Sequence, residues 1–217
     1  MRITVAIDGP AGAGKSTIAK IIGDRFDLMY INTGAMYRAV ALKALEKNIS
    51  HENINELCSL IDSLDMKFEE EKLIINGEDV SDQITTPYIS SNVSNYAAVY
   101  EVREKLVDMQ RYMSEKYNVI MDGRDIGTVV LKDASFKFFL TASCEERANR
   151  RYKELKEKNI NVLYENVLND IIKRDYIDSN REVNPLRKAC DAIEIDCSKL
   201  SILEVVDIIS NYIKKVI

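Results

Sequence analysis

A phosphate-binding loop near the N-terminus constrains the fold of this chain more than any other feature of its sequence. Residues 9–16 spell GPAGAGKS and match the pattern G-x-x-x-x-G-K-[ST]. The apolar run Ile3–Ile7 before the loop is typical of a buried parallel strand, and a helical spacing of apolar residues begins at Ile18. A strand, a loop and a helix in this order predict an α/β fold with a P-loop NTPase core that binds a nucleoside triphosphate.

The residue types in this loop fit phosphate chemistry. Glycines let the backbone curl with its N–H groups pointing inward, and the helix N-terminus adds partial positive charge. We expect Lys15 to reach the terminal phosphates and the Ser16 hydroxyl to bind Mg²⁺ together with phosphates and water. A glycine-rich turn without a ligand is the alternative, but the strand and helix in register disfavour it. The residues assigned to ATP in this segment are Gly9, Pro10, Ala11, Gly12, Ala13, Gly14, Lys15, Ser16 and Thr17.

Five short apolar segments predict one parallel sheet covered by helices on both faces. They are Ile3–Ile7, Leu28–Ile31, Asn118–Met121, Phe136–Leu140 and Ala192–Ile195. Residues 66–68, 72–75 and 79–80 interrupt the alternation of strands and helices, and Asn76-Gly77 is a strong tight-turn signal between the last two. This pattern indicates a small antiparallel β insert. With 217 residues and no Pro/Gly/Ser-rich linker, the chain is expected to form a single domain.

Charge and composition disfavour several classes of protein. The net charge of −5, with acidic and basic residues interspersed, argues against a non-specific nucleic-acid binder, and no apolar run approaches the ~20 residues of a membrane span. The N-terminus enters a strand at once and the cysteines form no C-x-x-C pair, so we expect a cytoplasmic protein with reduced thiols. The only histidine, His51, lies in a polar stretch. Phosphoryl transfer tolerates the lack of a histidine, because it depends on positioning and charge neutralisation.

An arginine-bearing motif follows the second predicted strand. Residues 32–38 spell NTGAMYR, in which a hydroxyl and a glycine turn are followed by an arginine. Thr33 can donate one hydrogen bond to an acceptor monophosphate, and Arg38 offers a planar bidentate fork that lysine lacks. An ordinary loop and helix start with a surface arginine is the alternative for this motif taken alone.

A second motif, DGRD, occupies residues 122–125 directly after an apolar run. It lies at the carboxyl end of a predicted central strand, where ligands bind in open α/β sheets. We expect Asp122 to organise the hydrated Mg²⁺, and Arg124 and Asp125 to point into the cleft. A plain Asp-Gly turn is the alternative, but two flanking charges at the end of a buried strand disfavour it.

The region from residue 147 to residue 181 carries arginines at helical spacing. Arg147, Arg150 and Arg151 fall at i, i+3 and i+4 and therefore share one face of a helix. The same argument applies to a second set, which is Arg174, Asp178 and Arg181. A solvated charged surface is the alternative. We favour a closing lid, because charge that builds on a transferring phosphoryl group must be met by cations where water is scarce.

Taken in order, these motifs resemble those of the bacterial cytidylate kinases, members of the nucleoside monophosphate kinases. The likeness runs from IDGPAGAGKST through TGAMYR, the insert, Val102-Arg103, DGRDIGTVV and RDYIDSNR to the C-terminal helix, and so covers essentially the whole chain. Many NTPases share the phosphate loop, whereas the ordered set is far more specific. An insert of small strands in the monophosphate-binding region distinguishes this family from its adenylate kinase relatives.

The resemblance implies a role for each matching position. The acceptor phosphate would be bound by Thr33, Arg38 and Arg124, and the base by Ser94, Arg103 and Asp125. The ribose would be contacted by Arg174 and Asp178, Arg181 would be a further phosphate contact, and Arg150 would contact ATP. The residues assigned to catalysis are Lys15, Asp122, Arg124 and Arg181. Some relatives carry Ser where this chain has Thr33, and either residue supplies the hydroxyl.

The resemblance also implies an architecture and an activity. The core would comprise residues 1–33, 117–149 and 166–217, the monophosphate-binding region with its insert 34–116, and the lid 150–165. The expected reaction is Mg²⁺- and ATP-dependent phosphorylation of CMP and dCMP in pyrimidine metabolism, by a monomer that binds no nucleic acid or membrane. Two alternatives stay open: another P-loop kinase, acting for example on shikimate or a different nucleotide, and a non-catalytic nucleotide switch.

Overall fold

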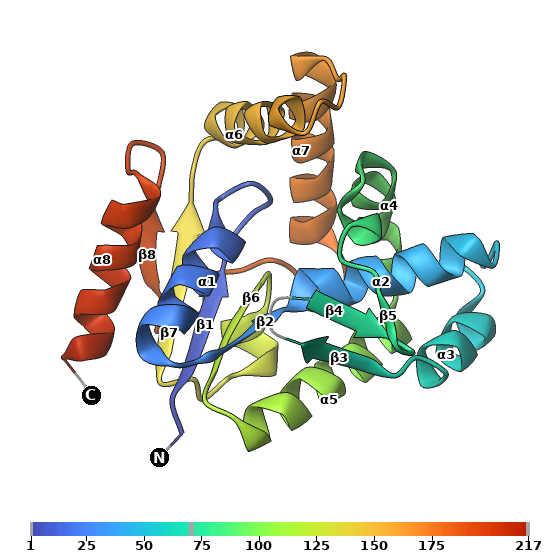
Figure 1. The fold of residues 1–217 in the computed structure, drawn as a ribbon, viewed down its shortest axis with the longest axis horizontal. Coiled ribbons are helices and arrows are strands. Elements are labelled where there is room, and N and C mark those ends of the chain that lie inside the picture. The colour runs from blue at the N-terminus through green and yellow to red at the C-terminus, as the bar shows by residue number, and fades with distance from the viewer. Residues whose placement is uncertain (1, 70–71, 216–217) are drawn as a thin grey trace.

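The computed structural model describes residues 2–69 and 72–215, which fold into two sheets surrounded by helices (Figure 1). The α-helices are α1 (Lys15–Phe26), α2 (Thr33–Glu46), α3 (Ile54–Asp62), α4 (Pro87–Ala97), α5 (Tyr100–Lys116), α6 (Cys144–Glu157), α7 (Tyr164–Asn180) and α8 (Ile202–Lys214). A 3₁₀ turn, η1 (Gln83–Thr85), and a π-helix, η2 (Ile126–Val130), complete the helical elements of the described residues. No helix in this part of the chain has the length and apolar character to cross a membrane.

The main sheet confirms the predicted parallel architecture. Its strands are β1 (Thr4–Asp8), β2 (Met29–Asn32), β6 (Val119–Gly123), β7 (Phe136–Thr141) and β8 (Ile193–Asp196). They lie in the order β2-β6-β1-β7-β8, and every neighbouring pair is parallel. The register places Asp8 beside Gly123 and Asn32 beside Asp122. The carboxyl ends of β1, β2 and β6 therefore bring the phosphate loop and the DGRD motif to one edge of the sheet.

Alternating side chains of the central strand serve two separate cores, because successive residues of a strand point to opposite faces. Val5 and Ile7 pack with α1 and α8, where Ile18 and Ile209 are fully buried. Ala6, on the opposite face, belongs to the larger cluster that α2, α4 and α5 complete with the insert. Burial on both faces explains why the core strands are nearly continuous apolar runs in the sequence.

The predicted antiparallel insert is present between β2 and β6. It consists of β3 (Met66–Glu69), β4 (Lys72–Ile75) and β5 (Glu78–Asp79), in the order β3-β4-β5. Asn76 and Gly77 link the last two strands with φ values of 51° and 85°. Positive φ at both central residues is the requirement of the tight hairpin turn that the Asn-Gly pair predicts. The insert packs against the core through buried side chains such as Leu73 and Ile75.

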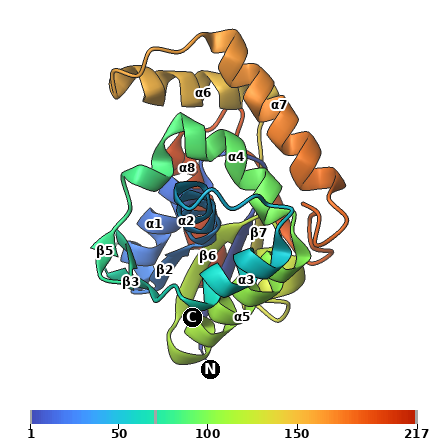
Figure 2. The same ribbon diagram turned by 90° about the vertical axis from the view of Figure 1, so that its right-hand side faces the viewer.

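Helices α6 and α7 form a separate layer at the end of the molecule to which β7 points. Figure 2 shows them projecting beyond α4 and the rest of the core. They are joined to each other by a small apolar cluster of their own, which includes Leu155, Val167 and Ile171. α7 also contacts α4, so the α6–α7 hairpin (residues 144–180) adjoins the monophosphate-binding region assigned from the sequence.

Candidate active site

The phosphate loop connects β1 to α1 through glycines that other residues could not replace. At Gly9, a Cβ atom would lie 2.1 Å from the Leu140 carbonyl oxygen of β7, so any side chain would collide with backbone. Gly14 precedes α1 with a φ of 83°, a left-handed conformation that favours glycine. These two positions allow the loop to turn tightly over the sheet and aim the first N–H groups of α1 outward.

Lys15 and Ser16 open α1 and face the end of β6. The Lys15 ammonium donates to the Pro10 carbonyl at 2.7 Å, and only 5% of the residue is exposed. Burial and the nearby Arg124 guanidinium hold the pKa of Lys15 well below its usual range. The Ser16 hydroxyl donates to one Asp122 carboxylate oxygen at 2.9 Å. The structure therefore places the predicted Mg²⁺ ligand Ser16 directly beside the predicted organiser Asp122.

Asp122 is fixed from three sides. Besides Ser16, the Tyr30 hydroxyl donates to its other carboxylate oxygen at 2.8 Å. The Thr33 hydroxyl donates to the Asp122 main-chain carbonyl at 2.7 Å, which ties the start of α2 to the end of β6. Burial and the Asp122 charge both raise the pKa of the Tyr30 phenol, so it stays a hydrogen-bond donor. Tyr30 carries no motif signal, and sequence reasoning did not identify it.

Arg38 lies over the N-terminus of α2, and its guanidinium forms no ion pair within the described residues, although the Asp122 charge acts on it. The Asn32 side chain accepts from the Ala35 N–H and caps the helix at 2.9 Å. The guanidinium lies near Gly34, where a Cβ would come within 3.2 Å of it. The Arg38 Nε atom is buried and has no hydrogen-bond partner in the described part of the chain, and burial lowers the pKa of this guanidinium.

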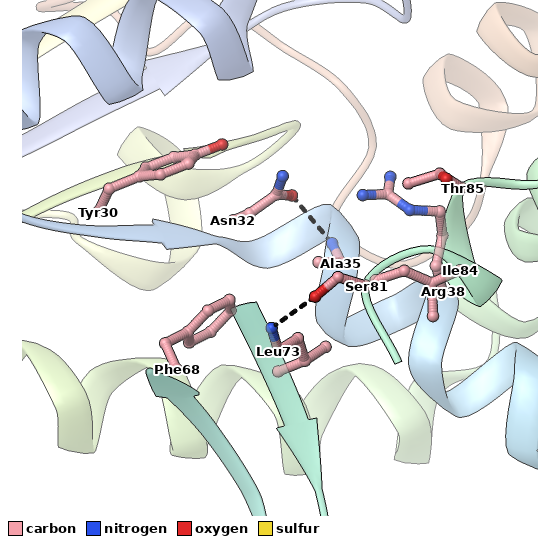
Figure 3. Close-up of a pocket in the computed structure, with 9 residues that line it drawn as sticks. All are labelled: Tyr30, Asn32, Ala35, Arg38, Phe68, Leu73, Ser81, Ile84 and Thr85. Atoms are coloured by element: carbon pink, nitrogen blue, oxygen red, sulfur yellow. Dashed lines mark hydrogen bonds between the residues drawn. The ribbon is translucent and has the colours of Figure 1, made fainter. Parts of the chain in front are cut away.

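This guanidinium enters a pocket of about 160 Å³ between the core and the insert. In Figure 3 it lies between the side chains of Asn32 and Thr85. The lining residues are Tyr30, Asn32, Ala35, Arg38, Phe68, Leu73, Ser81, Ile84 and Thr85. A buried cation with an unpaired N–H at a helix N-terminus is a ready site for an anion.

A second cluster forms around Asp178 of α7. The Arg124 Nε atom donates to one carboxylate oxygen at 2.8 Å, and the Ser94 hydroxyl lies 3.5 Å from the other. Arg174 approaches the same carboxylate at 4.0 Å. Burial alone would raise the pKa of Asp178, but Arg124 and Arg174 outweigh it and lower the pKa. Burial and repulsion from Arg124 lower the pKa of Arg174 to about 10.

A third cluster is built on Asp125 and Arg103, which form a buried ion pair. Arg103 is 1% exposed, also donates to the Ala97 carbonyl at 3.0 Å, and stands 5.1 Å above the Tyr37 ring. Arg181 lies 3.6 Å from the other Asp125 oxygen. Burial opposes the charge of Arg103, but Tyr37 and Asp125 outweigh it and raise its pKa. Of the three residues assigned to base recognition, the structure pairs Arg103 with Asp125. The third, Ser94, donates a hydrogen bond to Asp178 instead.

The interpretation of Arg147, Arg150 and Arg151 as one arginine face of a lid is wrong for Arg147. This residue is 3% exposed and donates to the carbonyls of Ala11 and Ala142, at 2.8 Å and 2.9 Å. It also forms an ion pair with Asp175 of α7 at 2.6 Å. Arg147 therefore packs against the phosphate loop and holds it in place. Arg150 pairs with Glu146 and donates to the Cys197 carbonyl, and Arg151 pairs with Glu154.

The positive charge of this region exceeds its fixed negative charge. Lys15, Arg38 and Arg174 all have lowered pKa values, because each is at least half-buried and close to other cations. Water cannot screen these groups well, so bound anions would relieve their repulsion. A model of the family described as cytidylate kinase matches residues 5–215 of the chain. The chain belongs to the cytidylate kinase family.

Similar proteins agree with this assignment. A cytidylate kinase of Clostridium perfringens (strain SM101 / Type A) is 68% identical over 213 residues, which is 98% of each chain. A cytidylate kinase of Clostridium acetobutylicum is 66% identical over 215 residues, 99% of each chain. The solved structure of a shikimate kinase from Bacteroides thetaiotaomicron matches with a TM-score of 0.51 and 12% identity, covering 99% of both chains. This last likeness shows the P-loop kinase fold alone.

The residues that support the site, and do not carry its predicted chemistry, are the ones that sequence reasoning missed. Tyr30 and Tyr37 lie inside a strand and a helix, where an aromatic residue normally indicates core packing. Asp175 belongs to the RDYIDSNR segment but has a partner, Arg147, that lies far away in the sequence. Asp8 directly follows the apolar run before the loop, and its partners come from η2. The one sequence signal that could have identified Asp8 was its position, as a charged residue at the end of a buried strand.

Proposed function

We propose that this cytidylate kinase transfers the γ-phosphoryl group of ATP to CMP, and also to dCMP. The observation that carries the proposal is the arrangement of cations between the phosphate loop and the Arg103–Asp125 pair. Lys15 is buried there and Arg38 and Arg174 are half-buried, all three with lowered pKa values and too little fixed counter-charge. Two nucleotides placed with their phosphates end to end would supply the missing anions. Phosphoryl transfer needs such positioning and neutralisation more than any covalent step by the protein.

The donor side fits ATP with Mg²⁺. The Ser16 hydroxyl would be an oxygen ligand of the kind that Mg²⁺ prefers, and the Asp122 carboxylate, 2.9 Å from it, would organise the water around the ion. Across residues 2–69 and 72–215, no set of three or more His, Cys, Asp or Glu side chains is placed to hold a metal ion. Ser16 would therefore hold the ion together with phosphate oxygens and water. When bound, Mg²⁺ supplies charge neutralisation at the donor phosphates, and Lys15 adds a further cation.

The acceptor side fits a monophosphate. Arg38, with its buried unpaired Nε, and the N-terminus of α2 would bind the acceptor phosphate, with Thr33 at the same helix start. Arg124 and Arg181 would meet the charge on the group in transfer. The new bond joins a CMP phosphate oxygen to the γ-phosphorus as the bond to the β–γ bridging oxygen breaks. The acceptor oxygen is already anionic, so no general base is required.

The buried Arg103–Asp125 pair suits cytosine. Cytosine presents an amino donor at N4 beside acceptors at N3 and O2, and so needs a carboxylate and a donor. Uracil would place its O4 acceptor against Asp125 and its N3–H against Arg103. Such mismatched buried groups cost about 1–3 kcal/mol each. We therefore expect a preference for CMP over UMP of about ten- to a hundredfold per mismatch.

Asp178 and Arg174 would contact the ribose. A 2′-hydroxyl bonded to the Asp178 carboxylate would favour CMP over dCMP, but that carboxylate keeps its bond to Arg124 when the hydroxyl is lost. Considerable dCMP activity is thus expected. The lid, residues 150–165, and the insert would close over the nucleotides to exclude water, which would otherwise hydrolyse ATP. We take the enzyme to be a monomer in the cytoplasm that binds neither nucleic acid nor membranes.

Coupled assays with CMP, dCMP, UMP and AMP test the proposal. CMP should give the highest kcat/KM, dCMP should follow, and AMP should be poor. A higher kcat/KM with AMP or UMP than with CMP would overturn it. Shikimate is included as an acceptor because of the shared fold. Thermal melting adds a second readout, because CMP alone should raise the Tm of a protein that binds it. A nucleotide switch would not respond to CMP.

A further inference from the structure

An unusual helix cap lies beside the residue assigned to base recognition. Asp125 occupies the N-cap position of η2, yet its side chain makes no capping hydrogen bond. An aspartate at this position normally accepts from the second or third N–H of its own helix. Here the Asp125 carboxylate turns away and pairs with Arg103 and Arg181.

Asp8, the last residue of β1, caps η2 in place of Asp125. Its two carboxylate oxygens accept from the N–H groups of Ile126 and Gly127, at 2.8 Å and 2.7 Å. These are the first two amides of η2, so both oxygens are used for the cap. The next residues of η2 are held by Asp125 through its carbonyl, which accepts from Val129 at 2.9 Å. At the start of η2, the Asp8 side chain therefore binds the first two N–H groups, and the Asp125 main-chain carbonyl accepts the bond from Val129.

The surroundings of Asp8 keep this arrangement fixed. Asp8 is 3% exposed and ends the central strand β1, directly before the phosphate loop. The charged neighbours of Asp8 are Lys15 and Asp125, and the Lys137 side chain lies against Gly127, from whose N–H Asp8 accepts. The Lys137 ammonium is engaged with Asp191 at 2.7 Å, and that of Lys15 with the Pro10 carbonyl. The cap is therefore the principal hydrogen-bonding role of Asp8.

We propose that Asp8 is a specificity-positioning residue, which caps η2 in place of Asp125 and thereby frees the Asp125 carboxylate to recognise the base. This inference deepens the proposed function and rests on it. Without the cap, the free N–H group of Gly127, the second of η2, would compete with Arg103 for the Asp125 carboxylate. A carboxylate drawn back onto its own helix would leave both Arg103 and the cytosine amino group without their acceptor.

The variant Asp8→Asn tests this directly. It keeps the size of the side chain but replaces one acceptor oxygen with an NH₂ group, which cannot accept from an N–H. We expect the ratio of kcat/KM for CMP to that for UMP to fall about tenfold, the loss of one buried polar contact. The KM for CMP should rise, while the KM for ATP should change by less than about twofold, since the affected contact is on the acceptor side.

Two comparisons make the result specific. Asp207→Asn, at an exposed residue that pairs with Arg25, is the matched control and should change neither ratio nor KM. In an Asp125→Ala background, Asp8→Asn should have no further effect on the CMP/UMP ratio, because the residue through which it acts is gone. An equal effect in both backgrounds would overturn the proposal.

Other outcomes are equally decisive. An unchanged CMP/UMP ratio in Asp8→Asn, with a raised KM for ATP, would show that Asp8 serves only the phosphate loop. If Asp8→Asn does not fold, Asp8→Ser keeps one acceptor and is subject to the same criteria. Failure of the proposed function is distinguishable, because it would appear already in the wild-type protein as the lack of a preference for CMP.

Discussion

Replacement of Asp125 by asparagine should convert a cytosine-selective site into one that accepts uracil. The carboxylate is buried and paired with Arg103, which is 1% exposed, and Arg181 stands 3.6 Å away on its other side. Asn fills the same space and keeps one acceptor oxygen. Its NH₂ group, however, can donate to the O4 atom of uracil, which the carboxylate repels.

The size of the effect follows from the contacts that change. Each buried polar group left without its partner costs about 1–3 kcal/mol. With CMP, the variant loses an acceptor for the N4 amino group, and with UMP it gains a donor for O4. The two changes act in opposite directions on the two substrates, so the CMP/UMP ratio should fall about a hundredfold or more.

Stability must be measured alongside activity. Breaking a buried ion pair from one side typically costs about 3–5 kcal/mol. The loss here should lie at the low end, because Arg103 keeps its bond to the Ala97 carbonyl and its position over the Tyr37 ring. Thermal melting in the absence of nucleotide gives this value, and Asp207→Asn again serves as the exposed control.

The decisive assay is steady-state kinetics with both acceptors at saturating ATP. The reasoning predicts a lower kcat/KM with CMP, a higher or unchanged kcat/KM with UMP, and an ATP KM close to that of the wild type. A folded variant with the wild-type CMP/UMP ratio would refute the role of Asp125 in base recognition.

Three further predictions concern the donor side and pH. Lys15→Ala should lower kcat about a hundredfold or more with every acceptor, because a cation at the terminal phosphates is lost; a loss confined to one acceptor would contradict this. Tyr30→Phe removes a hydrogen-bond donor to Asp122 and should cost about 1–3 kcal/mol of stability. It should also raise the Mg²⁺ concentration needed for the half-maximal rate. An unchanged stability and an unchanged Mg²⁺ requirement would argue against a positioning role for Tyr30. Burial raises the pKa of Asp8 from 3.8 to about 7. At a pH between these two values, the folded protein therefore holds a proton on Asp8 that the unfolded chain has lost. The free energy of unfolding of the wild type, relative to that of Asp8→Asn, should therefore fall as pH rises from 5 to 7, by at most about 1.4 kcal/mol per pH unit. A rise would mean that the hydrogen bonds from Ile126 and Gly127 to the Asp8 carboxylate outweigh the effect of burial.

Local patterns were enough to predict the fold. Buried parallel strands must be apolar on both faces, and the positive φ values of Asn76 and Gly77 follow from the turn they form. The ends of the predicted strands differ from those in the structure by about a residue. Polar residues at strand ends, such as Asp8, still pair in the sheet although they do not belong to the apolar run.

The site was predicted less completely, because spacing along a helix does not show what its face packs against. Arg147 shares a face with Arg150 by spacing, yet it contacts the phosphate loop and pairs with Asp175 of another helix. Ser94 reaches Asp178 and not the Arg103–Asp125 pair for the same reason. Contacts between distant segments depend on tertiary packing, which a single sequence does not reveal.

Calorimetry with CMP tests the central claim most directly. In the proposed site, a cluster of cations and one buried ion pair hold a cytosine nucleotide next to the phosphate loop. Titration of CMP into the purified protein, alone and with a non-hydrolysable ATP analogue, should give saturable heat, and UMP should bind more weakly by about tenfold or more. No heat with CMP under either condition, or equal affinity for UMP, would contradict the account.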